Sequence, residues 1–175
     1  MVLVETALLL PLLLGLILGV IEFSFAFQSS AQLTHTVRSS ARSASVLAGE
    51  SNYAEATAHA AESALLGMTN TTPTEIWIFE ANGQGFPMPE GNTTFDSCGE
   101  HCIRYAWDGA SFDTSVPSGG GWSAATHQNC TEPFDQIGVY VKAEYQFMTR
   151  FFWDRQTMTE RAVFRFEPRP ASECA

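Results

Sequence analysis

Positive charge is scarce in this sequence and is absent from its first 37 residues. The 175 residues include 19 acidic residues and only nine basic ones, of which Lys142 is the single lysine, and the formal net charge is −10. Neutralising phosphates requires clustered cations. The composition therefore excludes nucleic acid as a partner, and it provides no polybasic anchor for anionic lipid.

The sequence also lacks the patterns of common enzymes. It has no phosphate-binding loop, no dinucleotide fingerprint and no Ser-His-Asp or Cys-His arrangement. Its four histidines have no acidic partners at catalytic spacing: His35, His59, His101 and His127. We therefore expect a protein that is not an enzyme and that holds no cofactor or metal. A calcium site in the acidic loops, which no loop motif supports, would use Asp96, Glu100, Asp108 and Asp113.

The longest apolar run is at the start of the chain. Between residues 1 and 27 the only charged residues are Glu5 and Glu22, and the rest is rich in Leu, Ile and Val. At 1.5 Å per residue, this run is long enough to cross a hydrocarbon core of about 30 Å. A cleaved signal sequence would need basic residues before the run and a small-residue cleavage site after it; the sequence shows neither. We expect a membrane-spanning helix.

Three residues within the run indicate how this helix packs. Pro11 is expected to kink it or to open it locally. Gly15 and Gly19 are four positions apart, a spacing that lets a second helix approach closely. We therefore expect the span to pack against other helices.

Glu5 is the most informative residue of the chain, because an ionised carboxylate within hydrocarbon is costly and normally has a partner. No cation lies within helical reach of it. The candidate partner is the α-amino group of Met1, in the same copy or in a neighbouring one; the alternative places Glu5 among lipid headgroups without a role. Glu22 lies where the span meets water, and we expect it to be a solvated or interfacial acid.

The N-terminal residues resemble those of a known family. Glu5, Pro11 and the triplet Ile21-Glu22-Phe23 are similar, position by position, to the N-terminus of TadE-like pilins of the tight-adherence (Tad) branch of type IV pili. Residues 41–44 resemble the segment that follows in that family, and residues 165–168 resemble its closing strand. The middle of the chain, about residues 68–136, carries no such resemblance.

The resemblance implies a basic leader that a prepilin peptidase removes, leaving Met1 as the first residue. It implies a structural subunit of an extracellular filament used in surface attachment. The subunit is first anchored in the inner membrane, and the pilus machinery then assembles it with copies of itself or related pilins. The alternative is a membrane-anchored minor pilin or adhesin that primes assembly or binds a surface ligand. The assembly residues are then Met1, Glu5, Pro11, Gly15, Gly19 and Glu22.

Beyond the span the sequence pattern changes from helical to β. Residues 28–67 predict an amphipathic helical stem that stops near Gly49 and restarts after Asn52, with Glu55 completing a capping box. Its buried face comprises Leu33, Val37, Ala41, Ala44, Ala48, Ala54, Ala58, Ala61 and Leu65. Strands are predicted at residues 74–80, 103–107, 137–147 and 157–166, the last two forming a hairpin that turns around residues 150–156. Loops are expected at residues 81–100 and 109–135.

These elements predict an α+β fold, in which a long N-terminal hydrophobic helix continues into the stem and packs on a small antiparallel β-sheet. We expect three parts: a membrane-spanning or filament-core helix (1–27), the helical stem (28–67) and an extracellular β head (68–175). Within the head, residues 68–135 carry nine acids and one base, whereas residues 136–175 carry five acids and six bases. These segments form either complementary patches that set the register between copies or a solvated acidic surface.

Four cysteines follow the span, on its translocated side. An even number of cysteines in an exported domain predicts two disulfides, and the sequence allows any of the three pairings of Cys98, Cys102, Cys130 and Cys174. A zinc site that adds His101 and His127 is the competing interpretation, although the spacing differs from that of common zinc modules.

An aromatic cluster lies near the predicted hairpin turn: Phe147, Phe151, Phe152 and Trp153. It belongs either to the core or to an exposed contact patch larger than a monomer usually presents, formed by Phe151, Phe152 and Trp153.

Overall fold

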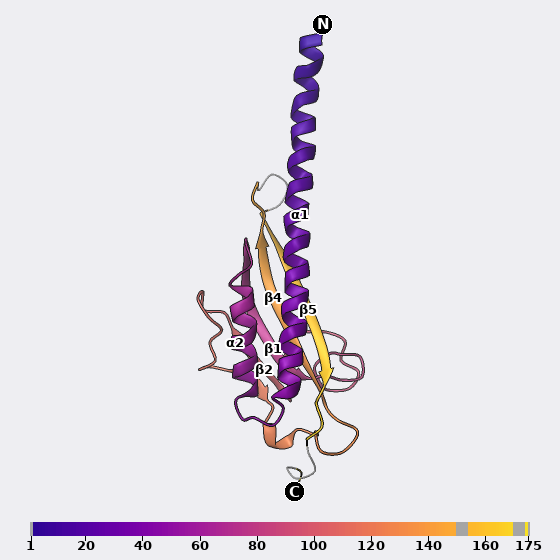
Figure 1. The fold of residues 1–175 in the computed structure, drawn as a ribbon, viewed down its shortest axis with the longest axis vertical. Helices are drawn as coiled ribbons and strands as arrows, with labels where there is room; N and C mark the ends of the chain where they lie inside the picture. Colours follow the sequence, from indigo (N-terminus) through magenta and orange to yellow (C-terminus); the bar gives the residue numbers. More distant parts are fainter. Residues whose placement is uncertain (1, 150–153, 170–173, 175) are drawn as a thin grey trace.

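The computed structural model describes residues 2–149, 154–169 and 174, with side chains from residue 6 onward. One long helix, α1 (Val2–Val46), forms the axis of the molecule. Its second half lies beside the shorter helix α2 (Tyr53–Leu65) and against a sheet, whereas its first half projects beyond the rest of the chain (Figure 1). The fold is α+β, as the sequence predicted.

The sheet is antiparallel and has five strands in the order β3-β2-β1-β4-β5. In chain order the strands are β1 (Thr71–Glu80), β2 (Cys102–Ala106), β3 (Ser118–Gly121), β4 (Gln136–Gln146) and β5 (Arg155–Arg165). β4 and β5 form the predicted hairpin, in which Gln146 lies opposite Arg155. Residues 155 and 156, which were expected in the turn, therefore belong to β5.

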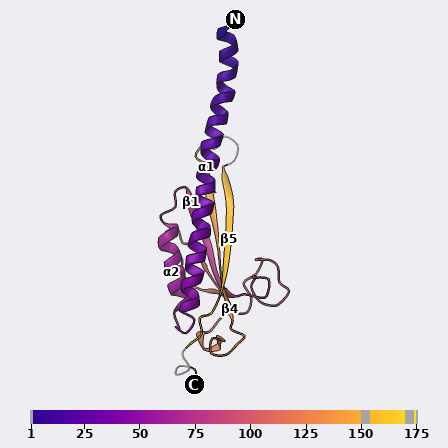
Figure 2. The ribbon, with the colours of Figure 1, turned by 45° about the vertical axis from the view of Figure 1, so that its right-hand side comes forward.

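The helix face predicted from the apolar spacing is the face that packs on the sheet. All of its nine predicted residues are at most 5% exposed. They form one core with the inward-facing residues of β4, including Ile137, Val139 and Val141. Both helices lie on the same side of the sheet (Figure 2). Because many of these positions are alanine, the helix backbones approach the sheet and each other closely.

The ends of the helices differ in detail from the expectation. α1 is one uninterrupted helix through Pro11, so the expected local opening is not observed, and it ends at Val46. α2 begins after Asn52 as predicted, but the Asn52 side chain makes no capping hydrogen bond. Gly49 has a different role from a helix stop: a Cβ there would lie 1.1 Å from Nη2 of Arg169. This guanidinium therefore packs at the C-terminal end of α1, where the helix dipole favours a cation.

A smaller apolar cluster lies on the opposite face of the sheet. Phe79 and Tyr140 are buried there, and Phe95, from the loop before β2, stacks on Tyr140 with ring centroids 4.1 Å apart. The guanidinium of Arg161 lies 3.7 Å from the ring centre of Phe86 in the same loop. The loop predicted at residues 81–100 thus covers the sheet face that the helices leave open.

The loop expected at residues 109–135 contains two short elements, the edge strand β3 and the 3₁₀-helix η1 (Ala124–Thr126). The sequence of β3 is Ser-Gly-Gly-Gly, which carries no β-forming side chains. Its glycines are required by close backbone approach, because a Cβ at Gly119 would lie 2.4 Å from the Cys102 carbonyl oxygen. The expectation of a plain loop is therefore wrong at residues 118–121 and 124–126.

The four cysteines form two disulfides, as predicted, and the structure selects the pairing. Cys98 pairs with Cys102 in the connection before β2. Cys130 pairs with Cys174 and so attaches the C-terminal end of the chain to the segment that precedes β4. The competing zinc interpretation is wrong, because all four sulfur atoms are used in these bonds.

Gly138 provides a test of this packing. It lies opposite Phe79 across β4 and β1, and a Cβ at position 138 would lie 2.3 Å from the Phe79 ring. Because overpacking a core typically costs about 1–3 kcal/mol, we expect Gly138→Ala to lower the free energy of unfolding by about that amount. Denaturant unfolding of the detergent-solubilised protein, followed by tryptophan fluorescence, measures the change.

Gly99→Ala is the matched control, since a Cβ at Gly99 meets nothing within 4 Å. This variant should unfold at the wild-type denaturant concentration. If the Gly138→Ala variant is as stable as the wild type, the packing of the Phe79 ring does not require the absence of a side chain at position 138.

Candidate functional site

The most unusual surface of the molecule is the first part of α1. Residues 2–21, called here the projecting segment, precede the point where α1 meets the rest of the described chain. The leucine side chains from Leu8 to Leu18 are between 49% and 75% exposed, and only 6% of the most apolar part of the helix is buried within the chain. Twenty helical residues span about 30 Å, which equals the thickness of a hydrocarbon core. The segment has the length and composition of a membrane span.

Gly15 and Gly19 lie on one side of this segment. A Cβ built on either residue would meet nothing within 4 Å. No described residue of the chain therefore occupies the close-approach face that the two glycines form.

Glu22 marks the end of the projecting segment and is not solvated. It is 8% exposed, and its carboxylate accepts hydrogen bonds from the backbone N–H groups of Met148, at 2.5 Å, and Thr149, at 3.0 Å. These residues closely follow β4, more than 120 positions later in the chain. The expectation that Glu22 is a solvated acid is wrong, whereas its expected place at the membrane interface stays a prediction. We call this interaction the Glu22 contact.

Aromatic side chains lie beside the Glu22 contact. Tyr145 is fully buried, and its ring packs edge-on against Phe147 with centroids 5.2 Å apart. Burial, and then the nearby charge of Glu22, raise the pKa of the Tyr145 phenol. The phenol is neutral at physiological pH. The described donors to the Glu22 carboxylate are backbone N–H groups.

The remaining residues assigned to assembly lie outside what the structure describes. Met1 is outside the described residues, and so is the side chain of Glu5, although its backbone is helical. The contact patch predicted at Phe151, Phe152 and Trp153 is also outside them. Phe147, which was grouped with that patch, is 7% exposed and belongs to the core.

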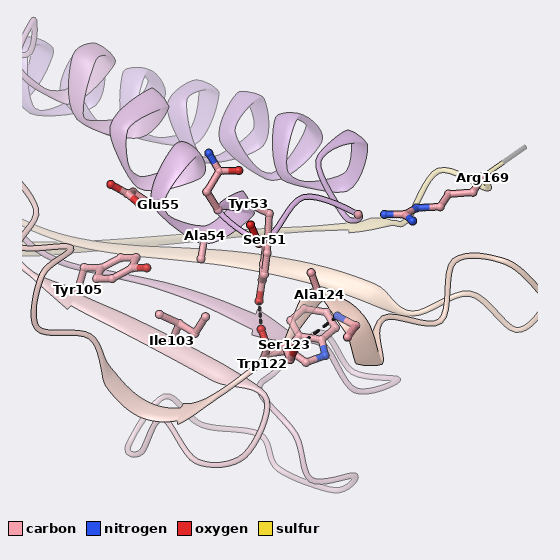
Figure 3. Close-up of a pocket in the computed structure, with 13 residues that line it drawn as sticks. Ser51, Tyr53, Ala54, Glu55, Ile103, Tyr105, Trp122, Ser123, Ala124 and Arg169 are labelled. Carbon is pink, nitrogen blue, oxygen red and sulfur yellow. Dashed lines mark hydrogen bonds between the residues drawn. The ribbon is translucent and has the colours of Figure 1, made fainter. Parts of the chain in front are cut away.

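A cleft of about 500 Å³ lies at the opposite end of the head, between the α1–α2 turn, β2 and η1 (Figure 3). Its rings are not available for stacking, because Tyr53, Tyr105 and Trp122 are each at most 5% exposed. The Tyr53 hydroxyl already donates a hydrogen bond to the Trp122 carbonyl at 2.7 Å. Polar side chains line its rim, among them Ser51, Glu55 and Arg169, but among the described residues no three His, Cys, Asp or Glu side chains gather there.

Two histidines do meet carboxylates, contrary to the sequence analysis. His59 lies 3.8 Å from Glu55 and 3.6 Å from Glu62, and His101 pairs with Glu80. Each histidine side chain is about half exposed, and neither pair lies beside a described nucleophile. Within the part of the chain that the structure describes, no three His, Cys, Asp or Glu side chains gather into a metal-binding group.

Comparison with known proteins identifies the N-terminal part of the chain. Residues 1–42 match the model of the family described as TadE-like protein. This match supports a TadE-like Tad pilus protein and covers the projecting segment, the Glu22 position and part of the docked half of α1. It does not reach residues 165–168, whose resemblance to the family stays a prediction. No curated protein and no solved structure matches the chain.

The Glu22 contact predicts a local effect of Glu22→Ala. Hydrogen bonds to a charged group contribute about 1.5–3 kcal/mol, so their loss should raise hydrogen exchange at the Met148 and Thr149 amides by at least about tenfold. The amides of Val139 and Val141, in the centre of the sheet, should exchange at wild-type rates. Hydrogen exchange of the full chain in detergent, read by mass spectrometry, makes this measurement.

Glu22→Gln is the matched variant, because the glutamine side chain keeps one acceptor oxygen but carries no charge. It should give an intermediate increase at the same two amides. Wild-type exchange at Met148 and Thr149 in the Glu22→Ala variant would contradict the contact.

Proposed function

We propose that this chain, whose first 42 residues are TadE-like, is a structural, pilin-like subunit of an extracellular Tad-type pilus used in surface attachment. In this proposal the filament is held together by the N-terminal helices of neighbouring copies. The folded head, with its two disulfides, lies on the outside.

The observation that carries the proposal is the exposure of the projecting segment. A contiguous apolar surface of this size is not stable in water and marks a membrane or protein contact. Lipid covers it while the protein is anchored. After extraction, the side chains that replace lipid must be equally apolar, and the same segment of other copies meets that requirement. The unfilled face at Gly15 and Gly19 supports close packing of such helices.

Glu5 and Met1 provide the chemistry that links processing to assembly. A carboxylate among apolar helices retains a desolvation cost of several kcal/mol unless a cation pairs with it. Removal of a leader by a prepilin peptidase creates an α-amino group at Met1, which is the cation that the N-terminal sequence otherwise lacks. The pairing of Glu5 with this amine, within one copy or between neighbours, makes processed chains competent to assemble in the inner membrane.

The proposal predicts how Glu5→Gln affects filament yield. The substitution keeps the shape of the side chain and removes its charge, so export and head folding should be unchanged. Because 1.4 kcal/mol corresponds to a factor of ten, loss of one buried ion pair should lower the yield of sheared filaments by at least about tenfold. Quantitative mass spectrometry of sheared material measures the yield, and in the wild type this chain should be the most abundant protein.

Glu167→Gln is the control for removal of an exposed carboxylate on the head, and it should assemble normally. If the Glu5→Gln variant forms filaments at the wild-type yield, the proposed role of Glu5 in assembly is wrong. A trace amount of this chain in wild-type filaments would instead identify a minor pilin or adhesin, which primes assembly or binds a surface ligand.

A further inference from the structure

Two arginines on the docked half of α1 have no carboxylate partner among the described residues. Arg38 and Arg42 are one helical turn apart, and both are exposed on the face of α1 that points away from the sheet. The ion pairs of the described chain use other cations. No acidic residue occurs in the sequence between Glu22 and Glu50. We call this surface the arginine face.

The cations of the sheet behave differently, because they are used within the head. Arg104 and Lys142 both approach Glu75, which lies between them on β1. Arg155 pairs with Glu144, at 3.3 Å.

Arg161 has no carboxylate partner among the described residues, but it donates to the Gly85 carbonyl and lies over the Phe86 ring. The arginine face is thus positive charge that the described part of one copy leaves uncompensated.

The complementary charge lies at the start of α2. Glu50, in the turn after α1, and Glu55, in the first turn of α2, are exposed. The described partner of Glu55 is His59, at 3.8 Å. No Lys or Arg occurs in the sequence between residues 43 and 103. Arg169 packs beside Gly49, but among the described residues it forms no ion pair with Glu50 or Glu55. We call this pair the glutamate face.

The two faces lie at similar heights along the molecule. α1 and α2 lie side by side at the end of α1, and α2 starts just after α1 finishes (Figure 1). At 1.5 Å per residue, Arg42 is about 6 Å and Arg38 about 12 Å before the end of α1, while Glu55 is about 3 Å into α2. A small axial step between parallel copies therefore brings an arginine of one opposite a glutamate of the next.

We propose that the arginine face of one copy docks against the glutamate face of a second copy of this chain, side by side in the filament; this inference rests on the proposed function. Across the helical layer, α1 lies over β4 and β5, whereas α2 lies over β1. The two faces thus lie on different sides of the helical layer. Such a head-to-tail contact between unlike surfaces generates an open helical assembly rather than a closed dimer.

The contact sets register more than it holds copies together. An exposed ion pair contributes little stability by itself, but charge complementarity selects one relative position among many. The apolar packing of the projecting segments holds the copies together, and the charged faces select the axial step between neighbouring copies. Exposed pairs are screened by salt, so high salt should loosen the order of the heads before it dissolves the filament.

Carbodiimide cross-linking of an Arg42→Lys variant tests the docking directly. The substitution keeps the charge and adds a primary amine, and the reagent condenses this new amine at position 42 with a carboxyl group across a contact to give an amide. Filaments are grown from equal amounts of ¹⁴N- and ¹⁵N-labelled chains. We expect a cross-linked peptide pair joining position 42 to Glu55 or Glu50 in which half of the pairs carry mixed labels.

Two results of this experiment would overturn the inference: cross-links from position 42 that join only like-labelled peptides, or no cross-link to either glutamate. Adding Glu50→Gln and Glu55→Gln should remove the product and serves as the chemical control. Failure to recover any filament of the wild-type chain contradicts the proposed function, whereas Arg42→Lys filaments that form without this cross-link contradict only the docking.

Charge reversal gives an independent test. Arg38→Glu with Arg42→Glu, or Glu50→Arg with Glu55→Arg, should each lower the yield of sheared filaments at least about fivefold. The combined four-residue variant should recover to within about twofold of wild type. A non-reducing disulfide map of exported protein shows that each variant has a folded head. If the combined variant stays as low as the arginine reversal alone, the arginines serve another surface, such as anionic lipid headgroups, and the docking is wrong.

Discussion

The structure depends on one constraint: a single helix must satisfy two environments along its length. The second half of α1 is amphipathic and buries Leu33, Val37 and Ala41 completely against the sheet. The first half is apolar on all sides and stays exposed beside the described residues of its own chain, so lipid or other copies must cover it. Because the helix is continuous, whatever holds the first half also positions the head. α1 therefore connects the apolar projecting segment rigidly to the polar, disulfide-bonded part of the chain.

The Glu22 contact determines where one environment ends and the other begins. A carboxylate at the end of an apolar span is expected to face water or a cation, but here two backbone amides that follow β4 satisfy its hydrogen-bonding demand. This arrangement brings the hairpin of β4 and β5 to the level of the span boundary. It also leaves about 30 Å of helix free, the length that both a bilayer and a bundle of neighbouring helices require. The head cannot slide along α1 without breaking these bonds.

Elements with local signals were predictable from the sequence, and long-range contacts were not. The spacing of alanines and leucines identified the buried helix face, and strict alternation identified β4 and β5. β3 was missed because its glycines carry no β propensity and are selected by close backbone approach to Cys102. The role of Glu22 depends on amides more than 120 residues away, and the disulfide pairing depends on the folded positions of four cysteines. Local sequence reports neither.

In the proposed filament, the projecting segments of neighbouring copies cover one another while Glu22 stays bound to the hairpin of its own chain. An electron cryo-microscopy map of sheared filaments at side-chain resolution tests this most directly. We expect a core of parallel helices formed by residues 2–21, with the Glu22 carboxylate at its rim still bonded to the Met148 and Thr149 amides. A map in which these helices do not contact one another, or in which Glu22 has left the hairpin to pair within the core, would contradict it.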